Sequence, residues 1–398
     1  MKIAEKIKEN KIFFTTFILL MVTGLTFILQ RDVRGLVDNY YYPLYVINYD
    51  CGYSSRLLVG AVFSLFFKDT LDISILTGVL LSVYLAFCFC LSLFVNKHLK
   101  KTDFEAVGVY VAFMTVSPAF VSLLNYFGIV DIFWFFCVMG ALCVVSKKGW
   151  RWLVPIFCAV GLAIHEVFLT TYLPVIAIAV LYQFIKKPKA SSFVFVAVCA
   201  VIVGAASVYF LILGDGTMKM NSAEMIQFAR DRLDINGKNF DEFYLKSVFF
   251  WETPGINGDE GFFEYLRYNF NILNSDHSRM QSVAFFALSN LLTLSPFVYL
   301  AVRAFGKEKN YGKRFVYLCS LMIFPLFIFQ FLFSTDTERF AMHWLLSVLF
   351  LLLFFIREKD EAFCKVFEES RSIILKNKTM LAFGAIAVAR IVLSGVRF

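Results

Sequence analysis

Long apolar runs separated by short polar segments are the dominant pattern of the sequence. Several of these runs reach the roughly 20 consecutive apolar residues that a helix needs to cross a bilayer. An outer-membrane barrel would instead show short strands of alternating polarity. The pattern predicts an all-α, polytopic helical membrane protein with spans at 12–29, 73–95, 104–122, 132–146, 191–213, 282–305, 315–333, 342–356 and 379–396.

The apolar stretch 152–185 is long enough for two short helices. It is flanked by basic clusters on both sides, KKGWR before it and KKPK after it. Cytoplasmic segments of membrane proteins are enriched in Lys and Arg, so both ends of this stretch belong on the cytoplasmic side. We therefore expect it to cross and return as a hairpin whose tip is His165 and Glu166. With this hairpin the chain has about 11 spans.

The N-terminal segment MKIAEKIKENK places four lysines before the first span, which predicts a signal anchor with a cytoplasmic N-terminus. Residues 30–72 and the long loop 214–281 then lie outside. The piece 57–67 is too short to cross and predicts an interfacial helix. The loop 214–281 is rich in aromatic residues, so we expect it to be ordered against the membrane surface. Residues 1–398 are predicted to form one integral domain of the plasma (inner) membrane.

Composition narrows the class of protein further. The chain is 59% hydrophobic and 17% charged, with a mean hydropathy of +0.71, which excludes a soluble enzyme. Its net charge of +8 is spread over short clusters between apolar runs, so it indicates topology and not nucleic-acid binding. Seven of the nine cysteines lie within apolar runs, where they act as small hydrophobes. Their spacing predicts neither a disulfide framework nor a metal site.

Under this topology, polar residues from four distant segments share the external membrane face. The segments are YDCGYSSRLLVG with Asp50, Tyr53 and Arg56, NYFGIVD with Asn125 and Asp131, IHEVFL with His165 and Glu166, and STDTERF with Asp336, Glu338 and Arg339. Ionisable groups at membrane depth are costly and indicate function by default. We expect these segments to form an active site that opens to the outside.

Each candidate also has a plainer interpretation. Asp50 and Arg56 can form a surface ion pair, which contributes little. Asp131 can simply cap the helix that follows it. His165 and Glu166 can solvate the hairpin turn, and charges are ordinary in a short loop such as STDTERF.

Two further residues lie outside these motifs. His343 sits just inside a span, which favours a packed or hydrogen-bonded histidine over a ligand. Trp251 and its aromatic neighbours in the long loop can cover the apolar face of a sugar ring.

Carboxylates, a histidine and two arginines at an external membrane face suit glycosyl transfer from a polyprenyl-linked donor. The acceptor hydroxyl loses a proton as it attacks the anomeric carbon, and a carboxylate or histidine can take that proton. Arginines stabilise the leaving phosphate. In this hypothesis Asp50 is the general base, and Arg56 and Arg339 bind the phosphate.

The remaining residues have supporting roles in this hypothesis. His165 and Glu166 orient or bind the acceptor, a cell-surface glycan or lipid-linked acceptor. Asp131 and Asp336 bind sugar hydroxyls or a divalent cation, Mg²⁺ or Mn²⁺, the one cofactor that the hypothesis allows.

The acidic first external loop, short hairpin tip and long external loop resemble membrane glycosyltransferases of the GT-C type. The motifs YDCGYSSRLLVG, NYFGIVD, IHEVFLTTYLP and STDTERF are also similar to those of bacterial multi-span proteins from surface-polysaccharide loci. The resemblance covers most of the chain in layout. It implies a lipid-phosphate sugar donor used outside the membrane, with a base in the first external loop. That role falls on Asp50 and, after it, on Asp38.

Three alternatives remain open from the sequence. A polymerase of lipid-linked oligosaccharides would use the same face and external arginines. A flippase or transporter of a lipid-linked sugar would place polar groups near the bilayer midplane. An acyltransferase could use His165 and Glu166 as its base. Because the spans are mostly apolar through their centres, the pattern favours an enzyme.

Overall fold

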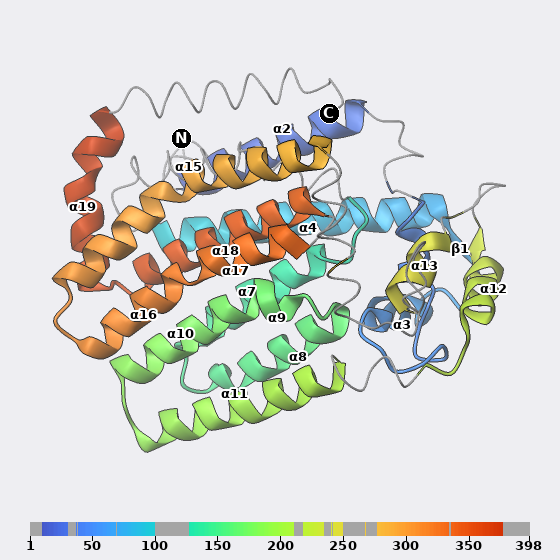
Figure 1. Ribbon diagram of the computed structural model, residues 1–398, viewed down its shortest axis with the longest axis horizontal. Helices are drawn as coiled ribbons and strands as arrows, with labels where there is room; N and C mark the ends of the chain where they lie inside the picture. Colours follow the sequence, from blue (N-terminus) through green and yellow to red (C-terminus); the bar gives the residue numbers. More distant parts are fainter. Residues whose placement is uncertain are drawn as a thin grey trace, which may run out of the picture.

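The computed structural model describes residues 10–30, 37, 39–68, 70–99, 127–210, 218–234, 240, 242–249, 267, 277–333 and 336–376. This part of the chain is mostly helical, which confirms the all-α prediction (Figure 1). Its strands are a pair of two-residue segments, β1 (Leu71–Asp72) and β2 (Leu233–Asp234), which pair in parallel.

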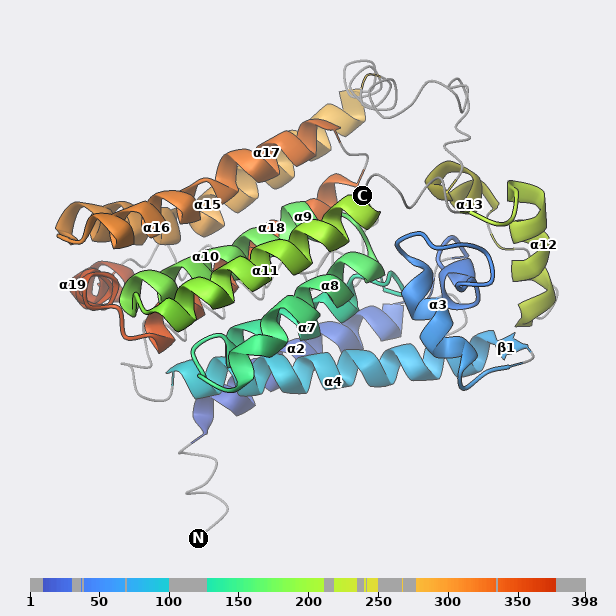
Figure 2. The same cartoon turned by 90° about the horizontal axis from the view of Figure 1, so that it is seen from below.

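The first two apolar runs form α2 (Lys11–Gln30) and α4 (Ile73–Leu99), which lie side by side in Figure 2. The Tyr84 hydroxyl donates a hydrogen bond of 3.1 Å to the Leu20 carbonyl. A Cβ atom at Gly24 would lie 2.7 Å from the Tyr84 ring, so a larger residue there would displace that ring. Small residues commonly allow membrane helices to pack closely in this way.

The two short helices and the turn expected within 152–185 are present, while their crossing of the membrane stays a prediction. The elements of this region are α7 (Ile132–Val144), η3 (Trp150–Leu153), α8 (Val154–Ile164), α9 (Phe168–Thr171), α10 (Leu173–Lys186) and α11 (Ala190–Val208). α8 ends because His165 adopts an extended backbone, and the chain turns back through α9 into α10. His165 and Glu166 are therefore at the tip, as the basic flanks predicted.

The C-terminal half packs around one fully buried helix. Its elements are α15 (His277–Lys307), α16 (Tyr311–Leu321), α17 (Ile323–Phe333), α18 (Thr337–Arg357) and α19 (Glu361–Lys376). Every residue of 339–356 in α18 is buried, and α18 lies in the middle of the bundle (Figure 1). Within the predicted span 315–333 the helix is irregular at Met322, between α16 and α17, where Pro325 has no N–H for the Leu321 carbonyl, but Tyr311–Ile328 continues as one helix.

The segments between spans fold into a small helical layer at one end of the bundle. It contains η2 (Tyr42–Tyr45), α3 (Leu57–Ser64), α12 (Ser222–Arg232) and α13 (Glu242–Phe249). The predicted helix at 57–67 is thus present as α3. The parallel β1–β2 pair ties the first loop to the long loop, and α12 and α13 show that the described part of the long loop is ordered.

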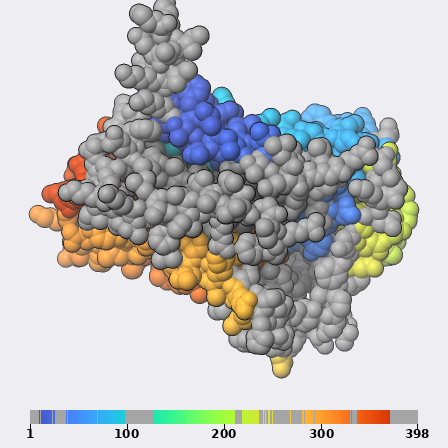
Figure 3. Space-filling model, turned by 90° about the horizontal axis from the view of Figure 1, so that it is seen from above, coloured from blue at the N-terminus to red at the C-terminus, as the bar shows by residue number. Residues whose placement is uncertain are grey.

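The molecule has two distinct ends. The turns after α7, α10, α15 and α18 contain Lys or Arg and lie together at what we term the basic end (Figures 1 and 2). The layer with α3, α12 and α13 occupies the opposite end, which we term the site end. In the space-filling view of Figure 3, the yellow-green α12–α13 region likewise lies opposite the orange-red C-terminal helices.

Four helices are long and apolar enough to cross a membrane, namely Ile73–Lys97, Ala190–Val208, Tyr311–Ile328 and Thr337–Arg357. A fifth is added if α15, bent by 45° between Leu291 and Thr293, is one span. Several apolar helices thus confirm the membrane class for the residues described. The count of about 11 and the orientation stay predictions, and the spans predicted at 104–122 and 379–396 lie outside the described residues.

Candidate functional site

Asp131 and Arg339 form a buried ion pair at the site end, between the start of α7 and the first turn of α18. Asp131 is 0% exposed, and its two carboxylate oxygens accept hydrogen bonds from Arg339 Nε at 2.5 Å and Nη2 at 2.8 Å. The Asp131 carbonyl starts α7, but its side chain makes no cap hydrogen bond. The side chain therefore joins two helices and does not cap one.

His343 extends this pair one turn deeper along α18. Its Nε2 lies 2.8 Å from Asp131 Oδ2, and its Nδ1 lies 2.8 Å from the Tyr172 hydroxyl. Because an ionised carboxylate only accepts, Nε2 carries the proton and Tyr172 donates to Nδ1. Arg339 Nη1 also donates to Asp336 at 3.2 Å. We call Asp131, Tyr172, Arg339 and His343, together with Asp336 at their partly exposed edge, the buried network.

The charge state of Asp131 follows from these contacts. Burial alone would raise its pKa, but the Arg339 guanidinium and the His343 hydrogen bond outweigh burial and hold the pKa below its usual range. Asp131 is therefore ionised at neutral pH, and its pairing with Arg339 is charge-assisted and bidentate.

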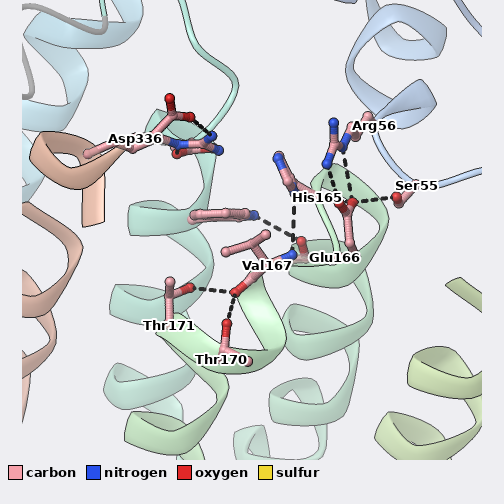
Figure 4. A network of polar contacts seen from close by, with 12 residues as sticks. Ser55, Arg56, His165, Glu166, Val167, Thr170, Thr171 and Asp336 are labelled. Atoms are coloured by element: carbon pink, nitrogen blue, oxygen red, sulfur yellow. Dashed lines mark hydrogen bonds and ion pairs between the residues drawn. The ribbon is translucent and has the colours of Figure 1, made fainter. Parts of the chain in front are cut away.

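A second cluster joins the first predicted external loop to the hairpin tip (Figure 4). Glu166 accepts hydrogen bonds from Ser55 Oγ at 2.6 Å, from Arg56 Nε at 3.1 Å and from Arg56 Nη2. The Arg56 backbone N–H donates to the Ala163 carbonyl at 3.0 Å. His165 Nδ1 lies 3.1 Å from Glu166 Oε2. We call Ser55, Arg56, His165 and Glu166 the rim network.

The rim network holds one charged carboxylate and one neutral imidazole. Burial alone would raise the pKa of Glu166, but the Arg56 guanidinium outweighs it and keeps the pKa well below its usual range. Burial, reinforced by the charge of Arg56, lowers the pKa of His165 to about 4. His165 is therefore neutral and a weak base near pH 7, and its Nδ1 accepts a hydrogen bond from the Val167 N–H at 3.3 Å.

Backbone strain marks the same place. Arg56 has a φ of 72°, in the left-handed region that non-glycine residues rarely adopt. Such strain costs on the order of 1–3 kcal/mol and persists only where surrounding contacts hold it. The contacts here are the two guanidinium bonds to Glu166 and the backbone bond to Ala163.

Trp134 connects the two networks. It lies one turn into α7 from Asp131, is fully buried, and donates from Nε1 to the Gly161 carbonyl at 3.0 Å. Its ring centroid lies 5.4 Å from that of His165 and 5.2 Å from that of His343. The two histidines thus flank one indole, and the networks form one candidate site.

Asp50 and Tyr53 face a different neighbour. The Asp50 side chain is 66% exposed and has Arg232 of α12 at 3.8 Å. The Lys219 ammonium lies 3.2 Å from the Tyr53 hydroxyl and 4.3 Å from the centroid of its ring. The loop 48–56 therefore contacts α12 through its first half and the hairpin tip through Arg56. The ion pair between Asp50 and Arg56 considered from sequence is replaced by the Arg56–Glu166 pair.

The described carboxylates of the site do not fit a divalent cation. Both oxygens of Asp131 are bonded to Arg339, which also binds Asp336. No group of three His, Cys, Asp or Glu side chains within the described ranges is arranged to hold a metal. Asn125, Trp251 and Asp38 lie outside the described residues, so the roles predicted for them stay predictions.

Four residues of the site were not among the sequence candidates: Ser55, Trp134, Tyr172 and His343. His343 follows Arg339 by four residues, which places both on one face of a helix. The sequence favoured a packed or hydrogen-bonded role for His343, and His343 is indeed hydrogen-bonded, to Asp131. Tyr172 belongs to the motif IHEVFLTTYLP, but nothing in its local sequence points to His343.

No protein-family model, curated protein or solved structure matches the chain. The resemblance to GT-C enzymes therefore rests on layout and motifs alone.

Proposed function

We propose that the protein is a GT-C-like glycosyltransferase of the plasma membrane. It would transfer a sugar at the external face from a polyprenyl phosphate or diphosphate donor to a cell-surface glycan acceptor. The observation that carries the proposal is the meeting of two arginine–carboxylate pairs at the end of the bundle opposite the basic turns. The pairs are Arg56–Glu166 and Arg339–Asp131, from four separate segments.

The solvent exposure and pairing of each carboxylate indicate which one can act as the general base. A general base must reach the substrate hydroxyl directly or through one water. Asp131 and His343 are fully buried, and Glu166, 23% exposed, is engaged by Ser55 and Arg56. Asp336, 41% exposed, is bonded to Arg339. Asp50, by contrast, is 66% exposed, lies 3.8 Å from Arg232 and belongs to the loop that carries Arg56. In the proposed reaction the acceptor oxygen bonds to the anomeric carbon and its proton passes to Asp50.

The bond from the anomeric carbon to the phosphate oxygen breaks in the same step, and its electron pair leaves with the polyprenyl phosphate or diphosphate. Arg56 suits the stabilisation of that charge because its guanidinium is held at the rim by Glu166. Lys219 and Arg232 contact the same loop and add positive charge there. Arg339 is buried with its donors on Asp131 and Asp336, so we assign it a positioning role.

A lipid-linked-sugar flippase is the second candidate, favoured by one observation. Arg339, His343 and Ser347 form a buried polar stripe along α18, where Ser347 Oγ donates to the Thr171 carbonyl at 3.2 Å. Polar groups buried inside a membrane bundle often mark a transport path. A polymerase of lipid-linked oligosaccharides would run the same chemistry as the transferase, with a second lipid-linked glycan as acceptor.

Turnover by the purified full chain in nanodiscs, with a panel of polyprenyl-linked sugars, tests the assignment of Asp50. Asp50→Asn is expected to lower turnover by about 10²–10⁴-fold, because a positioned base contributes about that much. Asp231→Asn, an exposed aspartate on α12, is the matched control and should retain activity. Normal turnover by Asp50→Asn would overturn the assignment, and products longer than one transfer would identify a polymerase.

A further inference from the structure

The basic end of the bundle contains a pocket of about 280 Å³, far from the candidate site. Its walls come from the end of α7, η3, the end of α10 and the start of α11. Three serines line it, together with four basic residues, which are Lys148, Arg151, Lys187 and Lys189. None of the lining residues is acidic, and all of them are within the described ranges.

The surroundings of the pocket reinforce its positive charge. The connections 144–153 and 186–190 contain six basic residues and no acidic one. Glu358 is an acidic side chain beside the pocket: it interacts with Gln183 and Ser146 of the lining, and its charge is paired with Lys186 at 2.9 Å. Concentrated charge of one sign in a cavity raises the local concentration of the opposite ion. The pocket therefore suits an anion.

Arg151 is held in place for such a ligand. Its Nη2 donates to the Ser191 carbonyl at 2.8 Å, and its guanidinium lies 5.0 Å from the centroid of the Phe195 ring. A fixed guanidinium loses less freedom on binding a phosphate than a mobile one. α11 begins at Ala190 beside it, so the positive end of a 19-residue helix faces the same space.

The helix that leaves the pocket presents an apolar surface. In α11, Phe193 is 64% and Val201 is 70% exposed, as expected of a helix that faces lipid. Trp150 and Trp152, the chain neighbours of Arg151, are exposed, and tryptophan is enriched where a bilayer meets water. A ligand with its phosphate in the pocket would have this surface available for acyl chains.

We propose that this pocket binds a phosphate group, that of an anionic phospholipid headgroup, at the basic end of the bundle. The proposal is independent of the reaction at the site end. Basic pockets between membrane helices commonly bind acidic headgroups. A soluble phosphate ester has the same recognition chemistry without the chains, so the experiment distinguishes the two sources.

The test measures binding of fluorescent phosphatidylglycerol to the purified full chain in neutral detergent, with fluorescent phosphatidylcholine as the zwitterionic reference. The double variant Lys148→Ala, Lys189→Ala removes two exposed pocket lysines. We expect it to bind phosphatidylglycerol roughly 10- to 30-fold more weakly. The double variant Lys309→Ala, Lys365→Ala removes two exposed lysines outside the pocket lining and should change affinity less than about 2-fold.

Equal losses in the two double variants, or equal wild-type affinity for the two lipids, would overturn the proposal. Matching unfolding temperatures of the variants show that a loss of binding is not a loss of fold. Competition by millimolar glycerol 1-phosphate then identifies the source. Displacement supports a phosphate site that accepts soluble esters, and retention supports a site that also needs the acyl chains.

Discussion

Removing the Arg339 side chain tests whether the buried network holds the site end together. Arg339→Ala would leave the Asp131 carboxylate buried, with the hydrogen bond from His343 of α18 still in place. Two charge-assisted hydrogen bonds, of 2.5 Å and 2.8 Å, would be lost. Breaking a buried ion pair from one side costs about 3–5 kcal/mol, because the remaining charge stays buried without compensation.

The matched control is the surface pair Arg230–Glu242, in which the arginine side chain is 52% exposed. Arg230→Ala should cost about 0–1 kcal/mol, because solvent screens an exposed pair. The two variants thus remove the same side chain from an ion pair in two environments. The measurement is the free energy of unfolding in mixed micelles or bicelles.

A double-mutant cycle separates the ion pair from general loss of packing. Asp131→Ala alone should also destabilise, because it leaves the buried Arg339 charge without its bidentate partner. Arg339→Ala combined with Asp131→Ala should cost less than the sum of the single changes, by at least about 2 kcal/mol. Additive single effects, or a cost for Arg339→Ala no larger than for Arg230→Ala, would refute the reasoning.

The remaining predictions concern the loop and the hairpin tip. A Cβ at Gly60 would lie 1.8 Å from the Ile47 carbonyl oxygen, so Gly60→Ala should displace the loop that carries Ser55. This variant should lower the free energy of unfolding by over about 2 kcal/mol and reduce turnover. Gly78→Ala, with nothing within 4 Å, should be neutral or stabilising by up to about 1 kcal/mol, and equal effects of the two would contradict the packing described. Ser55→Ala removes the 2.6 Å bond to the rim carboxylate and should cost about 1.5–3 kcal/mol; an unchanged unfolding free energy would show that the bond is not made. His165 has its pKa lowered to about 4, from an ordinary value of about 6.5, so the unfolded chain takes up its proton first as pH falls. Its contribution to stability is complete above pH 6.5 and is lost between about pH 6.5 and pH 4. The free energy of unfolding should therefore change less with pH over this window in His165→Asn than in wild type.

The helices and the hairpin were predictable because their signals are local. Apolar length located most of the described helices, and basic clusters on both sides of 152–185 required a turn near its middle, where His165 and Glu166 lie. The irregularity at Met322 also has a local signal in Pro325, although Tyr311–Ile328 continues through it as one helix. The predictions for segments outside the described ranges stay predictions.

The pairing of charges was not predictable, because it depends on how helices and loops meet. The predicted topology placed four charged residues at one end of the bundle, and the structure has them together at one end. They are Arg56, Asp131, Glu166 and Arg339. Sequence proximity suggested a partner for Arg56 within its own loop, but its partner is Glu166, 110 residues away. Such a choice is set by the rotation of each helix about its axis, which single-sequence periodicity does not fix.

The most direct test of the proposed function follows one donor molecule in proteoliposomes that contain the wild-type chain. A polyprenyl-linked sugar labelled in the sugar is supplied with a glycan acceptor, and both the product and the leaflet of the unreacted donor are measured. The proposal predicts labelled glycan together with a stoichiometric release of polyprenyl phosphate or diphosphate. Movement of intact donor between leaflets, with no transfer to the acceptor, would contradict it and identify a flippase.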